Sequence, residues 1–245
     1  MDVEKIYARW SYEDMIDRFA RRSSWLQLFH SEQKILKRLN CGFESVLDVG
    51  CALGSMSNVF EAIWPNIQYT GLDVSAEMIN RAKKSFPQHR FITTNVLDYR
   101  GTGINDFVFA TGVCQHEPQF KEAIVKLIEL AGKYVTFDCK IIHGHSSVID
   151  VDKSYCNHDD RLFYILVEYK DLLNILKAAT NIKSIYLYGY YAKVSEKVVV
   201  PNTIDKTKIS VCQVLIEKGD SGPAKWEFDL PDEFSETTTK FFNAN

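Results

Sequence analysis

The chain has 245 residues and a formal net charge of −3 at pH 7; 46% of the residues are hydrophobic and 25% are charged. This balance is ordinary for a globular protein, so it argues against a disordered chain and against a surface built to neutralise nucleic-acid phosphates. No stretch reaches the roughly 18 apolar residues of a membrane span, and the first residues lack the pattern of a signal peptide. The six cysteines form no C-x-x-C pair, which disfavours a zinc or redox motif. We therefore expect a cytoplasmic protein with free thiols, without membrane contact, and with nucleic acid disfavoured as a partner.

The order of the predicted elements indicates an α/β fold. Apolar residues at helical spacing predict helix over residues 11–39, which we interpret as a helical lid within residues 1–40. Short apolar runs then alternate with helical segments, which predicts a parallel sheet with helices on both faces. The predicted strands are 46–49, 69–72, 91–94, 107–110 and 134–138, and the predicted helices are 55–64, 76–85 and 120–130.

The last third of the chain follows a different pattern. After a predicted helix at 169–179, β-rich runs at 184–191 and 209–216 predict an antiparallel hairpin at the sheet edge, which completes a doubly wound, seven-stranded, mostly parallel sheet. Residues 141–161, rich in His, Asp and Ser, form a long insertion. We expect a single domain over residues 1–218 and a C-terminal tail, 219–245, that is partly ordered at best, although Trp226 and Phe228 could attach it to the body.

Loop 48–54, with the sequence Asp-Val-Gly-Cys-Ala-Leu-Gly, carries the clearest chemical signal. In open α/β sheets, ligands bind outside the carboxyl ends of the strands, where glycines let them approach the backbone. A dinucleotide-binding loop would read G-x-G-x-x-G instead, without a carboxylate just before its first glycine. Asp73 ends the next strand, which is the geometry for a ribose contact. The plainer alternatives are a turn cap for Asp48 and a helix N-cap for Asp73, although Ser75 suits the second role better.

Residues 46–54 resemble motif I of the class I (Rossmann-like) S-adenosylmethionine-dependent methyltransferases. Four further segments match in order: 71–75 with Met78, the adenine-side segment 91–98, the segment 106–116 beside the methionine moiety and the acceptor, and the closing hairpin 184–216. The resemblance covers about residues 40–217. It implies S-adenosylmethionine as cofactor, S-adenosylhomocysteine as product, and Asp73 as the carboxylate that holds both ribose hydroxyls. Where the family usually has Asp, this chain has Asn95, whose amide oxygen could accept from the adenine amine. The implied cofactor-binding residues are Asp48, Gly50, Cys51, Ala52, Gly54, Asp73, Val74, Met78, Asn95, Val96, Thr111 and Gly112.

Several polar residues are candidates for the acceptor side. His116 follows the fourth predicted strand and titrates near neutral pH, so it is a candidate general base, although a packing role is the alternative. The substrate-side candidates are His143, His145, Tyr12 and Arg22; a solvated insertion and a solvent-facing basic helix stripe are the alternatives. The His and Asp residues of the insertion predict no coordination geometry, so we expect no metal site.

The resemblance implies an enzyme of the EC 2.1.1 class that transfers a methyl group from S-adenosylmethionine. Because no nucleic-acid module or strongly basic patch is visible, we expect a small polar acceptor, and O-methylation of a sugar or natural-product hydroxyl is the leading hypothesis. The alternatives are a protein, RNA or N-methyltransferase, or a non-catalytic cofactor-binding scaffold of the same fold. The sequence leaves the oligomeric state open, and a homodimer is compatible with it.

Overall fold

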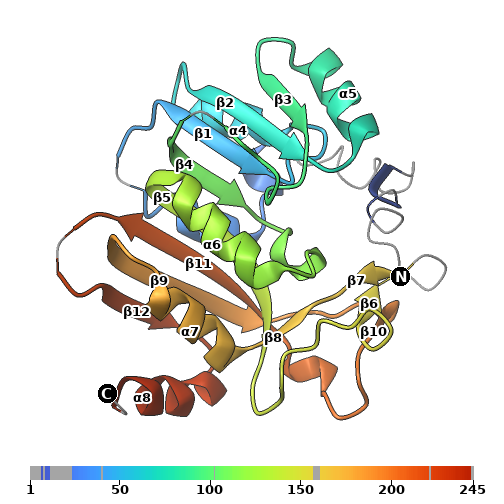
Figure 1. The fold of residues 1–245 in the computed structure, drawn as a ribbon, viewed down its shortest axis with the longest axis vertical. Coiled ribbons are helices and arrows are strands. Elements are labelled where there is room, and N and C mark those ends of the chain that lie inside the picture. Colours follow the sequence, from blue (N-terminus) through green and yellow to red (C-terminus); the bar gives the residue numbers. More distant parts are fainter. Residues whose placement is uncertain are drawn as a thin grey trace. The chain divides into compact units, whose positions relative to one another are not determined.

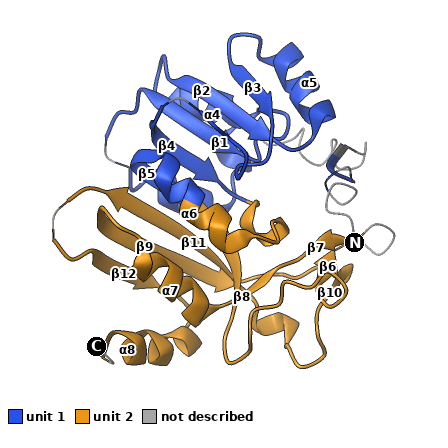
Figure 2. Ribbon diagram, in the orientation of Figure 1, with its two compact units in different colours: residues 1–111, 126–136 blue, residues 112–125, 137–245 orange. Residues whose placement is uncertain are grey.

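The computed structural model describes residues 7, 9–11, 24–39, 41–101, 103–156, 161–220 and 222–243. The chain forms two compact units, which Figure 2 shows in different colours. Unit 1 holds residues 1–111 and 126–136, and unit 2 holds residues 112–125 and 137–245. The single domain over residues 1–218 stays a prediction.

Unit 1 contains parallel strands with helices between them (Figure 1). Its strands are β1 (Ser45–Val49), β2 (Gln68–Asp73), β3 (Arg90–Thr93), β4 (Asn105–Ala110) and the first part of β5 (Ala131–Ile142), and its helices include α4 (Met56–Ile63) and α5 (Ala76–Ser85). β1 pairs in parallel with both β2 and β4, which places Asp48 opposite Gly71 and Phe109. The carboxyl ends of β1 and β2 therefore lie at the same edge of the sheet, as the sequence predicts.

The N-terminal part of unit 1 differs from the predicted continuous helix over residues 11–39. Its described elements are η1 (Arg9–Ser11), η2 (Trp25–Gln27) and α3 (His30–Leu36). Phe29 is extended, and its backbone N–H donates to Glu32 Oε2 at 2.8 Å, so a new helix begins there. Leu26 is 89% exposed, whereas Ile35 and Leu36 of α3 are buried, so the apolar spacing marks a buried face in α3 but not at Leu26. Residues 12–23, which the prediction also covered, lie outside the described residues.

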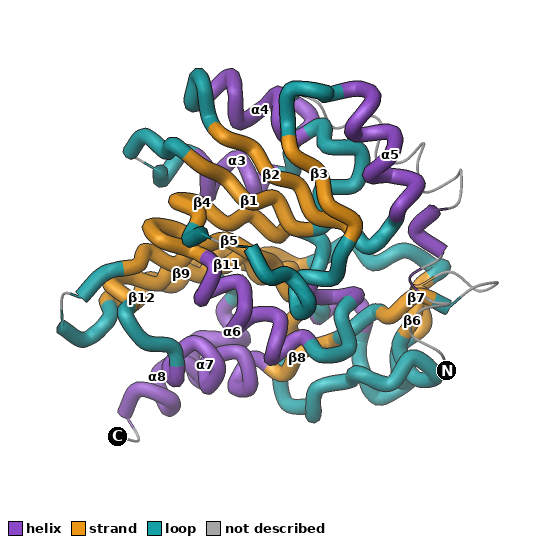
Figure 3. The backbone as a smooth tube through the Cα atoms, turned by 45° about the horizontal axis from the view of Figure 1, so that its top comes forward, coloured by secondary structure: helices purple, strands orange, loops and turns teal. Residues whose placement is uncertain are grey.

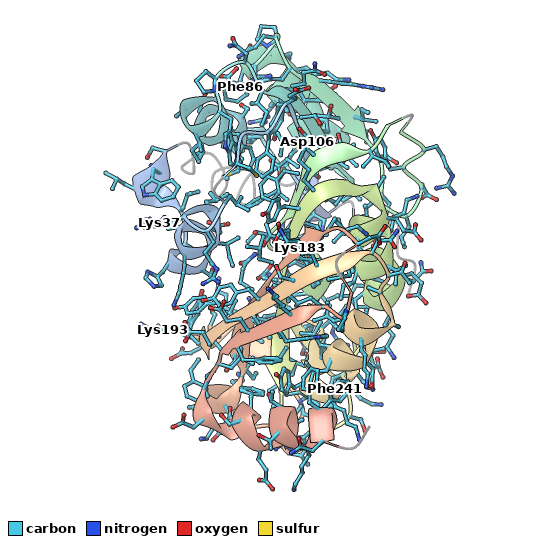
Figure 4. All side chains as sticks on the ribbon, turned by 90° about the vertical axis from the view of Figure 1, so that its left-hand side faces the viewer. Lys37, Phe86, Asp106, Lys183, Lys193 and Phe241 are labelled. Carbon is cyan, nitrogen blue, oxygen red and sulfur yellow. The ribbon has the colours of Figure 1, made fainter. Side chains whose placement is uncertain are left out.

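Unit 2 is organised around a long antiparallel pair, β9 (Ile182–Tyr191) and β11 (Ser210–Lys218), which confirms the predicted antiparallel pairing. Lys183 of β9, labelled in Figure 4, forms an ion pair with Glu217 of β11 at 2.6 Å. The chain enters this pair through β8 (Leu166–Glu168), which runs parallel to the end of β5, and α7 (Tyr169–Ala178). η3 (Cys114–His116) also belongs to unit 2, and α6 (Phe120–Leu130) contributes to both units.

The expectation of a C-terminal tail that is partly ordered at best is wrong. The tail forms β12 (Lys225–Asp229), η5 (Asp232–Phe234) and α8 (Ser235–Asn243), and β12 pairs in parallel with β9. Trp226 and Phe228 alternate with charged residues on β12, and their rings stack 5.9 Å apart. Because β12 lies beyond β9, the β9–β11 pair is not the edge of the sheet, and that part of the prediction is also wrong.

The insertion 141–161 contributes to a second, small sheet in unit 2. β6 (Tyr155–Cys156) pairs with β7 (Leu162–Phe163) and with β10 (Val198–Val199), and Figure 3 shows β6 and β7 side by side. A buried apolar cluster that includes Ile142, Leu166 and Val198 supports this region. The insertion is therefore anchored by strand pairing and apolar packing where the structure describes it.

The main sheet has nine described strands, ordered β12-β9-β11-β5-β4-β1-β2-β3, with β8 pairing β5 off this path. The predicted α/β class and mostly parallel sheet are confirmed, with β8 and β12 added to the seven expected strands. In the described part of the chain, no helix has the length and apolar character needed to cross a membrane.

Candidate cofactor and acceptor site

The glycine loop after β1 adopts a backbone that glycine favours. Gly50, Ala52 and Gly54 have φ values of 72°, 48° and 74°, in the left-handed region. The backbone N–H groups of Gly50 and Cys51 donate to the carbonyl of Leu72 at 2.8 and 2.9 Å, which ties the loop to the end of β2. A side chain at Gly54 would meet the ring of Phe91 at 2.5 Å, so this position needs glycine for space as well as for conformation.

Asp73 lies at the end of β2, beside this loop, and is 9% exposed. Its Oδ2 accepts the N–H of Ala52 at 2.9 Å, and its Oδ1 accepts the N–H of Ser75 at 2.8 Å. Each carboxylate oxygen has two lone pairs, so both oxygens can still accept a hydroxyl of a vicinal diol. Burial raises the pKa of Asp73, and the backbone N–H groups of Ser75 and Ala52 oppose that shift. Asp73 is not the cap of α5, because Ser75 Oγ accepts the N–H of Met78 at 3.2 Å.

Asp48 is buried at the end of β1, and the hydroxyl of Tyr69 donates to its Oδ2 at 2.5 Å. Burial, followed by the charge of Asp48, raises the pKa of Tyr69 well above its usual value. Burial and the charges of Asp73 and Asp48 likewise raise the pKa of the Cys51 thiol. Asp48 therefore lies within the core of unit 1, and Cys51 is a buried thiol rather than a reactive one.

The expected adenine side is formed after β3. Asn95 Oδ1 accepts the N–H of Leu97 at 2.9 Å, and Asn95 Nδ2 donates to the hydroxyl of Tyr7 at 3.2 Å. Met78 and Val96 are buried at 1% and 4% exposure, whereas Val74 is half-buried. The amide oxygen of Asn95 thus already accepts one backbone N–H, and the nearby Tyr7 was not anticipated from the sequence.

A surface pocket of about 300 Å³ opens along β3 in unit 1. Its lining includes four residues of the adenine-side segment 91–98 but neither Asp73 nor any residue of loop 48–54. We do not assign the cofactor to it, because the buried carboxylate and the left-handed loop carry the expected chemistry. Its lining residues are Arg90, Ile92, Thr93, Thr94, Asp98, Tyr99, Arg100 and Gly101.

The segment after β4 begins with Thr111, the last residue of that part of unit 1, and continues in unit 2 with Gly112. Gly112 has φ 82°, and its N–H donates to Asp138 Oδ1 at 2.5 Å. Asp138 is 4% exposed, and Lys140 Nζ lies 3.5 Å from its Oδ2. This carboxylate of β5 therefore holds the start of the segment that leads to His116.

His116 is half-buried and is contacted at both ring nitrogens. Its Nδ1 lies 2.5 Å from the carbonyl oxygen of Phe163, and its Nε2 lies 3.2 Å from Nε2 of Gln115. All three residues belong to unit 2. His116 thus has a fixed orientation, which suits either a structural role or a positioned base.

The other substrate-side candidates are less well supported. His143 and His145 are exposed; His143 Nδ1 lies 3.2 Å from Thr237 Oγ1, and the backbone N–H of His145 donates to Glu168. The structure thus places the side chain of His143 against α8. Tyr12 and Arg22 lie outside the described residues, and so do residues 157–160 of the insertion. Among the residues that are described, no group of three or more His, Cys, Asp or Glu side chains could hold a metal ion.

Residues 46–131 match the family model described as a methyltransferase domain. Over these residues the chain is similar to methyltransferase domains. A trans-aconitate 2-methyltransferase from Rhodopseudomonas palustris (strain BisB18) is 32% identical over 83 residues, which are 34% of this chain and 32% of that protein. The same enzyme from Escherichia coli (strain K12 / DH10B) is 29% identical over 87 residues, 36% of this chain and 34% of that protein. The aligned part of the chain therefore spans about a third of the length of these curated relatives.

Solved structures of two methyltransferases and a cyclase share the fold over most of the chain. A 1,6-didemethyltoxoflavin-N1-methyltransferase from Burkholderia thailandensis has a TM-score of 0.57 at 19% identity and covers 89% of this chain and 88% of its own. Phosphoethanolamine N-methyltransferase 2 from Haemonchus contortus has a TM-score of 0.62 at 14% identity, with 90% and 61% covered. The [4+2]-cyclase SpnF has a TM-score of 0.59 at 12% identity, with 90% and 98% covered. At these identities the likeness shows the fold alone.

Two contacts of the domain were missed by sequence reasoning. The bond from Tyr69 to Asp48 joins neighbouring strands, and a tyrosine beside a strand that ends in a buried acid is a signal that could have suggested it. The contact of Gln115 with His116 joins adjacent residues, but the carbonyl of Phe163 lies far along the chain and leaves no side-chain signal.

Proposed function

We propose that this protein transfers the methyl group of S-adenosylmethionine to a small molecule. The observation that carries the proposal is the position of Asp73: a buried carboxylate at the end of β2, hydrogen-bonded to the left-handed loop 48–54. An acidic side chain there suits a ribose diol, because each oxygen keeps a lone pair after accepting a backbone N–H. The relatives that match the domain by sequence are small-molecule methyltransferases by name, which supports the same reading.

The residues present fit this cofactor. Gly50 is exposed, so the backbone of the loop is open to a ligand there, and Asp73 and Asn95 carry acceptor oxygens of the kind that suits ribose and adenine. The bound cofactor would supply an activated methyl group on its sulfonium. The protein must then hold an acceptor in line with that group and exclude competing nucleophiles, which proximity and orientation achieve without covalent catalysis.

The acceptor class is open within this proposal. The named relatives act on trans-aconitate, 1,6-didemethyltoxoflavin and phosphoethanolamine derivatives, so the expectation of a sugar hydroxyl finds no support among them. A natural-product hydroxyl or a nitrogen acceptor stays compatible with the site. The cyclase SpnF has the same fold, so the fold by itself does not establish methyl transfer.

Calorimetric titration of the full chain with S-adenosylmethionine tests the proposal. We expect saturable 1:1 binding, and tighter binding of S-adenosylhomocysteine or an equal affinity for it would also agree with a methyltransferase site. Folded protein that binds neither molecule at millimolar concentration would refute the proposal. Release of S-adenosylhomocysteine in the presence of candidate acceptors then separates an enzyme from a cofactor-binding scaffold.

A further inference from the structure

The last strand of the main sheet, β12, has an open edge. Among the described strands it pairs with β9 alone, and it stands at one end of the strand order (Figure 1). Its five residues contain no proline, and its register with β9 runs from Lys225 to Asp229 without a bulge. The backbone N–H and C=O groups along such an edge can bind another strand. Both β9 and β12 belong to unit 2, so this edge is formed within one unit.

One face of β12 carries aromatic rings that are only partly covered. Trp226 and Phe228 lie opposite Ile185 and Leu187 of β9. Both rings contact the ring of Phe242 in α8, at centroid distances of 5.1 and 5.8 Å. Trp226 and Phe228 are nevertheless only half-buried, and Phe242 is 36% exposed. A strand added beside β12 would therefore bury more of this apolar face.

The opposite face of β12 is charged and exposed, with the order Lys225, Glu227, Asp229. Asp229 accepts a hydrogen bond from the hydroxyl of Tyr186 at 3.3 Å, which shows that this face lies on the side of β9 away from the aromatic rings. Charges directly opposite each other in a strand pair attract or repel according to their sign. The order of one positive and two negative side chains therefore selects which strand this edge accepts.

We propose that β12 pairs with β12 of a second copy of this chain, in an antiparallel, two-fold arrangement centred on Trp226. A two-fold axis at a sheet edge uses the same surface of both copies and makes the two strands antiparallel. This centre places Lys225 of each copy opposite the partner's Glu227, so two opposite-charge pairs form. Trp226 lies opposite the partner's Trp226, and the sheet of one copy continues into the sheet of the other.

Charge selects this centre over its neighbours on the strand. A centre on Glu227 would place the two copies of that glutamate opposite each other, and a centre on Phe228 would place Glu227 opposite Asp229 twice. The centre on Trp226 creates no like-charged pair. Glu227 already has an interaction within its own chain, but a carboxylate has several acceptor positions and can accept a lysine as well.

Sedimentation velocity of the full chain at about 1 to 200 µM tests the proposal, because an interface built on one short strand should have a dissociation constant in the micromolar range. We expect the mass to rise with concentration from 28.2 kDa towards twice that value. A chain that stays monomeric over this range would overturn the inference and leave the edge to water or to another partner. The measurement needs no cofactor, so its outcome is independent of the proposed function.

Charge exchange tests the register. Lys225→Glu creates like charges at both pairs, and so does Glu227→Lys, so each variant should weaken the dimer about tenfold or more. An equimolar mixture of the two variants restores opposite charges at both pairs and should form a heterodimer. The two exchanges combined in one chain should also restore the dimer. If Glu227→Lys formed a dimer of wild-type strength, the centre on Trp226 would be incorrect.

The matched controls are Lys197→Glu and Glu196→Lys, which make the same charge changes at exposed positions of unit 2 just before β10. Both should dimerise like the wild type. Circular dichroism verifies that all variants are folded, as expected for substitutions at exposed positions. A dimer that responds equally to the controls and to the β12 variants, or to neither, forms through another surface and would overturn the inference.

Discussion

The carboxylate of Asp73 accepts the backbone N–H of Ala52 at 2.9 Å, which joins the end of β2 to the middle of the glycine loop. Ala52 has φ 48°, a conformation that costs a non-glycine residue free energy. The hydrogen bond from Ala52 helps to offset that cost. The same side chain therefore shapes the loop and presents lone pairs to a ribose, so its replacement should affect both.

We predict that Asp73→Ala weakens binding of S-adenosylmethionine by about 1.5–3 kcal/mol, because a buried diol would lose its acceptor. Calorimetry measures the affinity, and denaturant unfolding without cofactor measures how far the loop itself is destabilised. The exposed carboxylate of Glu77, in the first turn of α5, provides the control Glu77→Ala, which should bind normally. Unchanged affinity in folded Asp73→Ala would rule out the ribose role.

Gly54→Ala should destabilise the protein by about 1–3 kcal/mol, because the new methyl group would lie 2.5 Å from the ring of Phe91 and φ is 74°. Urea unfolding of the cofactor-free chain measures the effect. Gly103→Ala is the matched control, since nothing lies within 4 Å of a Cβ built there. If the two variants were equally stable, the close packing of the loop against β3 would be incorrect. Combining Gly54→Ala with Phe91→Leu should recover part of the loss.

Tyr69→Phe should lower the free energy of unfolding at neutral pH by about 1–3 kcal/mol, because the buried carboxylate of Asp48 loses a donor. The pH dependence has a definite sign. Since folding raises the pKa of Tyr69, its stabilising contribution is fully present below its unfolded value of about 10 and is lost as pH rises further.

Unfolding measured between about pH 9 and 11 tests this sign, with the window set by the unfolded tyrosine pKa. The wild-type protein should lose stability more steeply than Tyr69→Phe as the pH rises. Tyr191→Phe, at a 44% exposed tyrosine, should follow the wild-type curve. Parallel curves for wild type and Tyr69→Phe would contradict the raised pKa.

Phe234→Ala should destabilise the protein by about 3–5 kcal/mol, because Phe234 is fully buried and packs edge-on against Tyr169 at 5.0 Å. The hydroxyl of Tyr169 also lies 2.8 Å from Thr238 Oγ1 of α8. Phe242→Ala, at 36% exposure in α8, should cost much less. Thermal or urea unfolding measures both, and a negligible effect of Phe234→Ala would show that the tail does not pack as described.

The central part of the fold could be predicted because local signals and the final structure agree there. Helices predicted at 76–85 and 120–130 have those bounds in the structure, since Ser75 caps the first and each carries a regular apolar face. Between residues 11 and 39 the same apolar spacing predicted one continuous helix, which is wrong, and Leu26 and Phe29 are exposed. Apolar spacing indicates which face of a helix could be buried. Whether that face is buried also depends on contacts from other elements.

The site residues likewise fall into a part that the sequence predicts and a part that it does not. Loop 48–54 and Asp73 were predictable, because their conformation and chemistry depend on residue types at fixed spacing. The hydrogen-bond partners of Asp48 and of Asn95 Nδ2 were not predictable. Each partner is a single tyrosine hydroxyl that comes from another part of the chain. The strand at Trp226 and Phe228 alternates as a strand should, but five residues bounded by glycine and proline are too short to distinguish from an irregular tail.

The anchor of His116 is a main-chain oxygen, and this limits how it can be altered. Any amino acid at position 163 keeps a carbonyl, so an alanine scan across the segment would leave the hydrogen bond in place and overlook it. Changing the length of the insertion before β7 would move the carbonyl and release the ring. Substitutions within the insertion that preserve its residue count should therefore leave this hydrogen bond in place.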